Sequence, residues 1–301
     1  MKTSLDCVPC LLRQALDAAR MFSRDPGVHE KILRDVLAWS RGMNMAQPAP
    51  VMGRRIYRRL RTLTGVKDPY RRAKTAQNRL ALRLLPELRT ALKKTADPLE
   101  LAVKFAIAGN IIDMGASGDV SLAGVRRAIR HALTEPLDGN HDAFSRAVKK
   151  AGSILYLADN AGEIVFDRLL IEQLGPGRVT VAVRGAPVLN DALLSDARAA
   201  GLHRIVEVID NGSDVAGTVL EEVSPRFKKT FMAADLVLAK GQGNFETLSE
   251  APRPVYFLFK AKCPVIAARA GVPLGAQVLA RSGAGKTIGK SGSVKKQRVG
   301  R

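Results

Sequence analysis

Two loops in the second half of the sequence carry residues that could bind a divalent cation beside a phosphate group. The run Asp159–Glu163 (DNAGE) and the pair Asn190-Asp191 offer carboxylate and amide oxygens. Oxygen ligands of this kind suit Mg²⁺ or Mn²⁺ and suit zinc poorly. Arg184 and Lys240 could neutralise a phosphate, and the glycines beside them let backbone N–H groups approach it. These residue types point to metal-assisted phosphoryl chemistry.

Each of these loops follows a short apolar run that is typical of a buried strand. Five such runs alternate with helical patterns: Ile154–Leu157, Val179–Val183, Ile205–Ile209, Leu236–Leu238 and Val255–Phe259. Strands joined by helical crossovers form a mostly parallel sheet that is covered by helices on both faces. Ligands bind beyond the carboxyl ends of such strands. We therefore expect four polar loops to converge on one edge, including those at 210–214 and 240–244. One such loop alone would be explained by turns and helix caps.

The first half of the sequence predicts helices, with apolar residues at helical spacing over 11–19, 28–44, 51–63, 69–95 and 98–112. Further helices are expected at 121–133 and 141–151. The predicted fold is α/β: a three-layer α/β/α domain with a mostly parallel sheet over 105–280, preceded by an all-helical N-terminal domain over 1–104. Residues 281–301 are rich in Gly, Ser, Lys and Arg, and are expected to form a disordered basic tail.

Composition excludes several classes of protein. The chain has 301 residues, 46% of them hydrophobic, which suits a globular core. It has no apolar run of about 18 residues for a membrane span and no signal peptide core. Its three cysteines are too few for a disulfide framework, so we expect a reduced, cytoplasmic protein. The net charge of +20 is concentrated, with +12 in residues 51–96 and +7 in residues 281–301.

Several motifs occur together in an order that resembles the damage-control phosphatase family, long known only as a domain of unknown function. They are Ala108–Asp113 (AGNIID), Leu157–Asp167 (LADNAGEIVFD), Arg184–Asp191 (RGAPVLND) and Ala239–Glu246 (AKGQGNFE). The opening Cys7–Leu12 (CVPCLL) together with Asp68–Tyr70 (DPY) is similar to the prokaryotic branch. The resemblance covers roughly residues 5–275.

This resemblance implies metal-dependent hydrolysis of phosphate monoesters of small metabolites, sugar-phosphate-like or damaged. The metal, Mn, Mg, Co or Ni, would be held by Asp159, Asn160 and Asp191, which are also the expected catalytic residues. Either a metal-activated water or Asp159 itself would attack the phosphorus. Candidates for contact with phosphate or substrate, by position in the motifs, are Asn110, Asp113, Arg184, Asp214, Lys240 and Asn244.

The cysteines allow two interpretations. Cys7 and Cys10 have the spacing of a metal knuckle, and Cys263 follows the last predicted strand, so the three could hold a structural zinc or iron. Alternatively, all three are small buried apolar residues.

Two other functions are left open by the residues alone. A carboxyl methyltransferase would also suit an α/β/α sheet with acidic loops, although its methyl donor usually meets a glycine-rich turn. A nucleic-acid-binding protein with a vestigial site would use the basic segment 51–96. The arginines at 54, 55, 58, 59 and 61, however, have the layout of a solvated helix face with few rings for stacking. We therefore expect a small phosphorylated metabolite as the partner, without membrane or nucleic acid.

Overall fold

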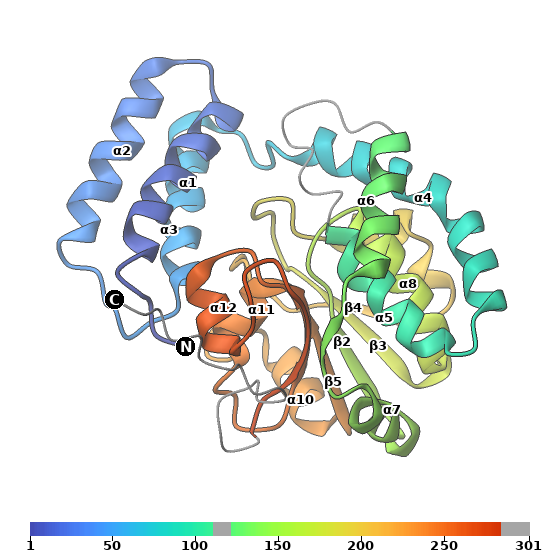
Figure 1. Ribbon diagram of the computed structural model, residues 1–301. Coiled ribbons are helices and arrows are strands. Elements are labelled where there is room, and N and C mark those ends of the chain that lie inside the picture. Colours follow the sequence, from blue (N-terminus) through green and yellow to red (C-terminus); the bar gives the residue numbers. More distant parts are fainter. Residues whose placement is uncertain (111–121, 284–301) are drawn as a thin grey trace, which may run out of the picture.

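One sheet organises the computed structural model, which describes residues 1–110 and 122–283 (Figure 1). In these ranges seven strands pair in the order β1-β7-β6-β5-β2-β3-β4. Their bounds are β1 Leu137–Gly139, β2 Ile154–Leu157, β3 Val179–Val183, β4 Glu207–Asp210, β5 Leu236–Lys240, β6 Tyr256–Lys260 and β7 Gln277–Arg281. The pairs are parallel except β6–β7, which is antiparallel. Because β2 lies between β3 and β5, the loops that follow these three strands share one edge.

All five predicted strands are present, with bounds that agree to within two residues. Two strands were not predicted, β1 with three residues and β7 in the glycine-rich C-terminal region. Arg281, the residue at which the tail was expected to begin, is instead the last residue of β7 and pairs with Tyr256 of β6. Residues 284–301 lie outside the described part of the chain.

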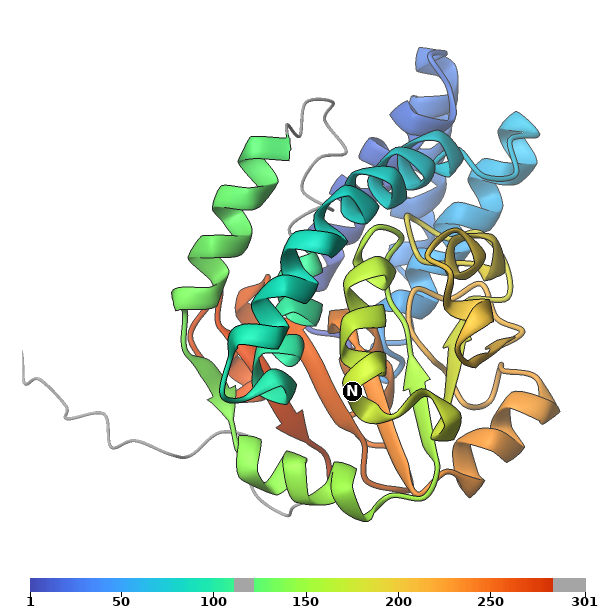
Figure 2. The ribbon, with the colours of Figure 1, turned by 90° about the vertical axis from the view of Figure 1, so that its right-hand side faces the viewer.

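The helices of the described ranges cover both faces of the sheet. They are α1 Cys7–Phe22, α2 Pro26–Ser40, α3 Ala49–Thr64, α4 Arg71–Lys94, α5 Pro98–Ala108, α6 Leu122–Thr134, α7 His141–Lys150, α8 Glu163–Leu174, α9 Leu194–Ala199, α10 Pro225–Ala233, α11 Gly241–Leu248 and α12 Pro264–Ala270. Figure 2 shows α4 and α8 lying across one face. Successive strand residues alternate between two cores, as the period of a strand requires: Tyr156 packs with α5 and α8, whereas Leu157 packs with α10 and α11. The predicted three-layer α/β/α arrangement is confirmed.

The N-terminal helices α1, α2 and α3 pack around a core of their own and stand to one side of the sheet (Figure 1). Helices α4 and α5 instead bury their apolar side chains, among them Leu88 and Phe105, in the core of the sheet domain. The boundary expected at 104/105 falls inside α5. Helical periodicity identifies an apolar face but does not say which core covers it. We therefore propose that the boundary lies between α3 and α4.

The arginines of α3 are not simply solvated. Arg54 pairs with Glu222, while Arg58 and Arg61 both donate to the carboxylate of Asp214, over 2.6 to 2.9 Å. Their acidic partners lie in the segment after β4, 153 to 168 residues away in sequence. These ion pairs hold the N-terminal helices against the edge of the sheet where the polar loops lie.

Within the described ranges, no helix combines the length and the apolar character that crossing a bilayer would require.

Candidate active site

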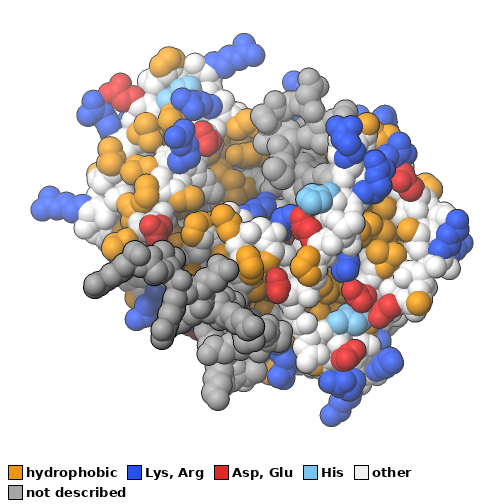
Figure 3. Space-filling view, viewed as in Figure 1, with side chains coloured by type: hydrophobic (Ala, Val, Ile, Leu, Met, Phe, Trp, Pro, Cys, Tyr) orange, Lys and Arg blue, Asp and Glu red, His pale blue; other side chains and the backbone are white. Residues whose placement is uncertain are grey.

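A cavity of about 550 Å³ lies where α1 and α3 face the carboxyl ends of β2, β3 and β5. The surface is hollowed between the N-terminal helices and the sheet domain (Figure 3). One part of the lining is polar: Asp159, Asn160, Glu163 and Asp191 come from the predicted loops, and Asn110 follows the end of α5. The structure thus brings the three predicted metal ligands and one predicted substrate residue to a single cavity.

The loops after β2 and β3 are joined by backbone pairing. Asn160 and Asp191 form an isolated antiparallel bridge. The N–H of Ala192 donates to the carbonyl of Asp159 over 2.7 Å, and the N–H of Ala161 donates to the carbonyl of Asn190 over 2.9 Å. This pairing fixes the position of each candidate ligand relative to the other two.

The side chain of Asn160 is oriented by two carboxylates. Its Nδ2 donates to Asp159 Oδ2 over 2.9 Å and to Glu163 Oε2 over 3.1 Å. Asn110 Nδ2 donates to the same Glu163 oxygen over 2.9 Å. Because the nitrogen of Asn160 is committed to these bonds, its amide oxygen is the atom that remains for a cation.

Arg184 lies against the two predicted aspartate ligands. Its Nε donates to Asp191 Oδ2 over 2.6 Å, and its Nη2 is 3.6 Å from Asp159 Oδ1. Nη2 is buried and has no hydrogen-bond partner among the described residues. A guanidinium nitrogen that is buried without a hydrogen-bond partner can still donate to an anion that enters the cavity.

Lys240 is completely buried behind the cavity and does not line it. Its Nζ donates to Glu163 Oε1 over 2.5 Å, to Asp167 Oδ1 over 2.7 Å and to the carbonyl of Ala106 over 2.7 Å. Burial alone would lower the pKa of Lys240, but the two carboxylates outweigh it and raise the pKa. Burial raises the pKa of Asp167 to about 6, against the opposing charge of Lys240. Lys240 thus remains a cation that holds Glu163 in place.

The cluster carries more negative charge than its cations balance. Burial raises the pKa of Asp159 well above its usual range, and the nearby carboxylates of Asp191 and Glu163 raise it further. With Asp167, four carboxylates face two cations, Arg184 and Lys240. The four carboxyl groups, when all ionised, exceed the two cations by two negative charges, and the raised pKa of Asp159 reflects the repulsion that a divalent cation of the Mg²⁺ or Mn²⁺ type would relieve.

The other residues predicted to contact substrate have different positions. Asn244 is buried, with Nδ2 donating to the carbonyl of Lys240 over 2.7 Å and Oδ1 accepting from Thr218 Oγ1 over 2.8 Å. Asp214 does not line the cavity and is held by Arg58 and Arg61. Asp113 lies outside the described residues. Among the predicted contacts, the geometry therefore favours Asn110, which lines the cavity, and Arg184, which does not line it but lies directly against Asp159 and Asp191.

The start of α11 borders the site at a position that only glycine fits. Gly241 has φ 78°, and a Cβ there would overlap the carboxylate of Asp159. The N-cap residue Lys240 makes no side-chain capping bond, and Gly241, Gln242 and Gly243 line the cavity. The backbone N–H groups of an uncapped first turn favour a bound anion.

Asn78 of α4 supports the loop after β2 and was not predicted from the sequence. Its Oδ1 accepts from the N–H of Gly162 over 2.7 Å, and its Nδ2 donates to Asp196 Oδ1 over 2.8 Å. Glu163 was missed as well, although it lies within the quoted motif. A charged side chain that completes its bonds inside the protein gives the same sequence pattern as a solvated helix residue.

The three cysteines line the same cavity as the carboxylates. Cys10 is exposed and the other two are half-buried, so they are not the fully buried residues that the apolar interpretation requires. Burial raises the pKa of Cys7 and of Cys10. Gln242 Nε2 lies 3.6 Å from the sulfur of Cys263. The three sulfurs do not all lie within 4.8 Å of one another.

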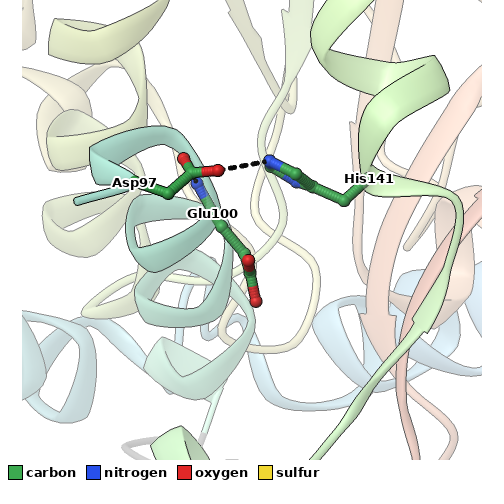
Figure 4. A group of neighbouring side chains, drawn as sticks. All are labelled: Asp97, Glu100 and His141. Atoms are coloured by element: carbon green, nitrogen blue, oxygen red, sulfur yellow. Dashed lines mark hydrogen bonds and ion pairs between the residues drawn. The ribbon is translucent and has the colours of Figure 1, made fainter. Parts of the chain in front are cut away.

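Within residues 1–110 and 122–283, one other group of side chains has metal-ligand chemistry: Asp97, Glu100 and His141, with ligand atoms within 4.8 Å of one another (Figure 4). Several of their polar atoms have partners within the protein, whereas His141 Nδ1 is buried without a hydrogen-bond partner among the described residues. Asp97 caps α5 by accepting from the N–H of Glu100 over 2.9 Å, and its other oxygen lies 3.0 Å from His141 Nε2. Glu100 pairs with Lys104 over 3.2 Å. This group does not line the cavity.

Known proteins that are similar to this chain match it over almost its whole length. The family model of the damage-control phosphatase ARMT1-like domain matches residues 3–278. A damage-control phosphatase of Pyrococcus horikoshii is 35% identical over 290 residues, covering 94% of this chain and 99% of that protein. A damage-control phosphatase of Archaeoglobus fulgidus is 32% identical over 284 residues, covering 92% and 98%. The crystal structure of a DUF89 family protein from P. horikoshii matches with a TM-score of 0.86 and 32% identity, over 94% of this chain and 100% of that chain.

Proposed function

The chain belongs to the damage-control phosphatase family, and we propose that it hydrolyses phosphate monoesters of small metabolites with the help of a divalent metal ion. The observation that carries this proposal is the buried set of oxygen ligands from two paired loops, with its excess negative charge. The phosphatases among the curated relatives favour this reading over a methyltransferase or a nucleic-acid-binding protein.

Asp159, Asn160 and Asp191 would hold the metal through their side-chain oxygens. When bound, a divalent ion at this position supplies Lewis-acid polarisation of the phosphoryl group and lowers the pKa of a water. The same residues suit Mn, Mg, Co or Ni, since carboxylate and amide oxygens accept each of these ions. Glu163 keeps the amide of Asn160 turned so that its oxygen remains available.

The phosphate would be bound by two groups that border the carboxylates. The buried Nη2 of Arg184 can donate to a phosphoryl oxygen while Nε keeps its bond to Asp191. The first backbone N–H groups of α11 add donors and a positive helix end. Asn110 would not donate to the phosphate, because its nitrogen is bonded to Glu163, and its amide oxygen could instead accept from a donor group of the substrate.

Lys240 would act as a positioning residue that holds Glu163 and Asp167, rather than as a direct phosphate ligand. Two nucleophiles suit the arrangement. A water can attack phosphorus directly, or the Asp159 carboxylate can attack and form an acyl phosphate that water then cleaves. In both cases the P–O bond to the substrate alcohol breaks, the alcohol takes its proton from water, and inorganic phosphate is released.

We further propose that Cys7, Cys10 and Cys263 bind a second metal ion, zinc or iron, at another part of the same cavity. The support is their common position on the cavity wall together with soft thiolate chemistry. Because the sulfurs are not all within 4.8 Å of one another, binding would draw them closer.

The proposed activity is tested by a phosphatase screen of the metal-free protein over p-nitrophenyl phosphate and a panel of metabolite phosphates. Each is measured without metal and with added Mg²⁺, Mn²⁺, Co²⁺ or Ni²⁺. We expect turnover only with metal. Equal phosphate release with and without metal, or none in any mixture, would contradict the proposal.

A further inference from the structure

A second cavity of about 550 Å³ lies between α4 and α9, and it shares no lining residue with the candidate active site. One wall is a single face of α4, because its lining residues recur at helical spacing. They are Arg71, Lys74, Thr75, Asn78, Arg79 and Leu82. The rest of the lining is Asp68, which precedes α4, together with Leu193, Ser195, Asp196 and Ala199.

Lys74 is the buried cation of this second cavity, with 3% of its side chain exposed. Its Nζ forms ion pairs over 2.7 Å with Asp68 Oδ2 and over 3.9 Å with Asp196 Oδ2. The same nitrogen is buried without a hydrogen bond to any described residue. Because an ammonium group has three N–H donors, Lys74 can still donate to an acceptor that enters the cavity.

The two carboxylates of the second cavity already have donors within the protein. Asp68 Oδ1 accepts from the N–H of Tyr70 over 3.0 Å, in addition to the ion pair with Lys74. Asp196 accepts from Asn78 Nδ2 over 2.8 Å and from the N–H of Leu193 over 3.0 Å. These bonds use both oxygens of Asp196, so the cavity does not offer it as a ligand for a cation.

Two arginines at the mouth of the second cavity carry the charge that remains. Arg71 and Arg79 line the cavity and are exposed, and neither has a carboxylate partner among the described residues. A guanidinium group binds phosphate oxygens through paired N–H donors. The hydroxyl groups of Thr75 and Ser195 add further donors to the lining. The cavity therefore presents cations and hydroxyl groups to an anion.

We propose that this second cavity binds a small phosphate monoester, at a site separate from the candidate metal ligands. A phosphate monoester carries close to two negative charges at neutral pH, which matches the two guanidinium groups that lack a carboxylate partner. The phosphodiesters of nucleic acids and phospholipids carry only one charge per phosphate. The volume exceeds what a phosphate group needs and leaves room for an organic group beside Leu82 and Leu193.

The second cavity lies behind the loop that carries the candidate metal ligands. Asn78 lines this cavity, and its Oδ1 accepts from the N–H of Gly162 over 2.7 Å. A bound phosphate monoester would therefore lie beside the side chain that supports the loop after β2. The proposal does not depend on the phosphatase function, because it concerns a site that shares no lining residue with the candidate active site.

The test is calorimetric titration of the full-length protein with phenylphosphonate, at a pH where this analogue is a dianion. A phosphatase cannot hydrolyse its C–P bond. Titrations with and without Mn²⁺ separate the two sites, since anion binding at the candidate active site should require the metal and binding in the second cavity should not. The monomethyl ester of phenylphosphonate has the same ring but one charge, and serves as the matched ligand.

We expect phenylphosphonate to bind without Mn²⁺, and its monomethyl ester to bind about tenfold more weakly because one charge is missing. Bound phenylphosphonate should also raise the thermal unfolding temperature of the metal-free protein by mass action. Absence of Mn²⁺-independent binding would overturn the proposal. Equal affinity for the monomethyl ester would overturn the assignment to phosphate monoesters.

A matched pair of double variants locates the binding. Arg71→Gln with Arg79→Gln should lower the Mn²⁺-independent affinity about tenfold or more, because both guanidinium groups at the mouth are lost. Arg72→Gln with Arg83→Gln removes the same charge from exposed positions of α4 that line neither cavity, and should keep the wild-type affinity. All four arginines are exposed, so both variants should unfold as the wild type does. Equal weakening in the two variants, or none in the first, would contradict the proposed site.

Discussion

Removing the side chain of Asn78 should impair the proposed metal site, although Asn78 does not contact the proposed ligands. Asn78 is 3% exposed and holds the N–H of Gly162, two residues after Asn160, over 2.7 Å. Its amide nitrogen bonds Asp196 Oδ1 over 2.8 Å. Asn78→Ala removes both bonds.

The magnitude follows from the groups left behind. A buried donor or acceptor that loses its partner costs about 1–3 kcal/mol. Asp196 still accepts a hydrogen bond from the N–H of Leu193, and its carboxylate lies 3.9 Å from Lys74 Nζ. The stability lost at Asp196 therefore lies at the lower end of this range. We expect about 2–4 kcal/mol of lost unfolding free energy in total.

The loss of activity should exceed what the loss of stability explains. Displacing the loop after β2 by about 1 Å is expected to lower kcat/KM about 10- to 100-fold at saturating Mn²⁺, and to weaken Mn²⁺ binding. Asn140→Ala is the control, because Asn140 caps α7 away from the cavity, and its loss costs about 1 kcal/mol of stability.

Urea denaturation and steady-state kinetics on both variants measure the two effects. Asn140→Ala should keep wild-type kcat/KM. If Asn78→Ala loses stability but hydrolyses p-nitrophenyl phosphate at the wild-type rate, the loop does not depend on Asn78 and the reasoning is wrong.

Three further predictions address the glycine at the site, the ion pairs and the cysteines. Gly241→Ala should lower phosphatase activity at least about tenfold, because its Cβ would displace Asp159, whereas Gly65→Ala, at a similar φ in open space, should lose only stability. Burial would raise the pKa of Asp214, but two arginines of α3 outweigh it and lower the pKa. The carboxylate therefore stabilises the fold above the ordinary carboxyl pKa of about 4, so the stability difference between wild type and Asp214→Asn in urea should shrink as pH falls through the lowered pKa. Cys10→Ser should lose about one zinc or iron per chain in elemental analysis, and an unchanged metal content would refute the cysteine site.

The sheet and the edge that carries the site could be predicted because their signals are local. The run Ile154–Leu157 is apolar on both faces, as a central strand must be, and the structure gives β2 the same bounds. The strand predicted at 205–209 is shifted toward the C-terminus in the structure. Strand β4 covers Glu207–Asp210 at the edge of the sheet, and Glu207 and Asp210 are exposed. A strand exposed on one side lacks the continuous apolar pattern that marks a central one.

The contacts behind the site could not be predicted, because they join residues that are far apart in the chain. Lys240 has the residue type of a phosphate ligand, but its partners Glu163 and Asp167 lie 77 and 73 residues away. Asn78 lies 84 residues from Gly162, on a helix whose pattern indicates only an apolar face. The residue types in the sequence identified the loop residues that line the cavity. The roles of the buried polar residues depend on tertiary packing, which the sequence pattern does not show.

The central claim is that Asp159 and Asp191 hold a divalent ion that phosphate hydrolysis requires. It is tested most directly by measuring Mn²⁺ binding and p-nitrophenyl phosphate hydrolysis across a Mn²⁺ titration, for wild type, Asp159→Ala and Asp191→Ala. Asp142→Ala, which changes an exposed aspartate of α7, is the control. We predict that wild type and the control show saturable, metal-dependent turnover, and that both site variants lose Mn²⁺ binding and activity while remaining folded. Wild-type binding and turnover in Asp159→Ala and Asp191→Ala would contradict the claim.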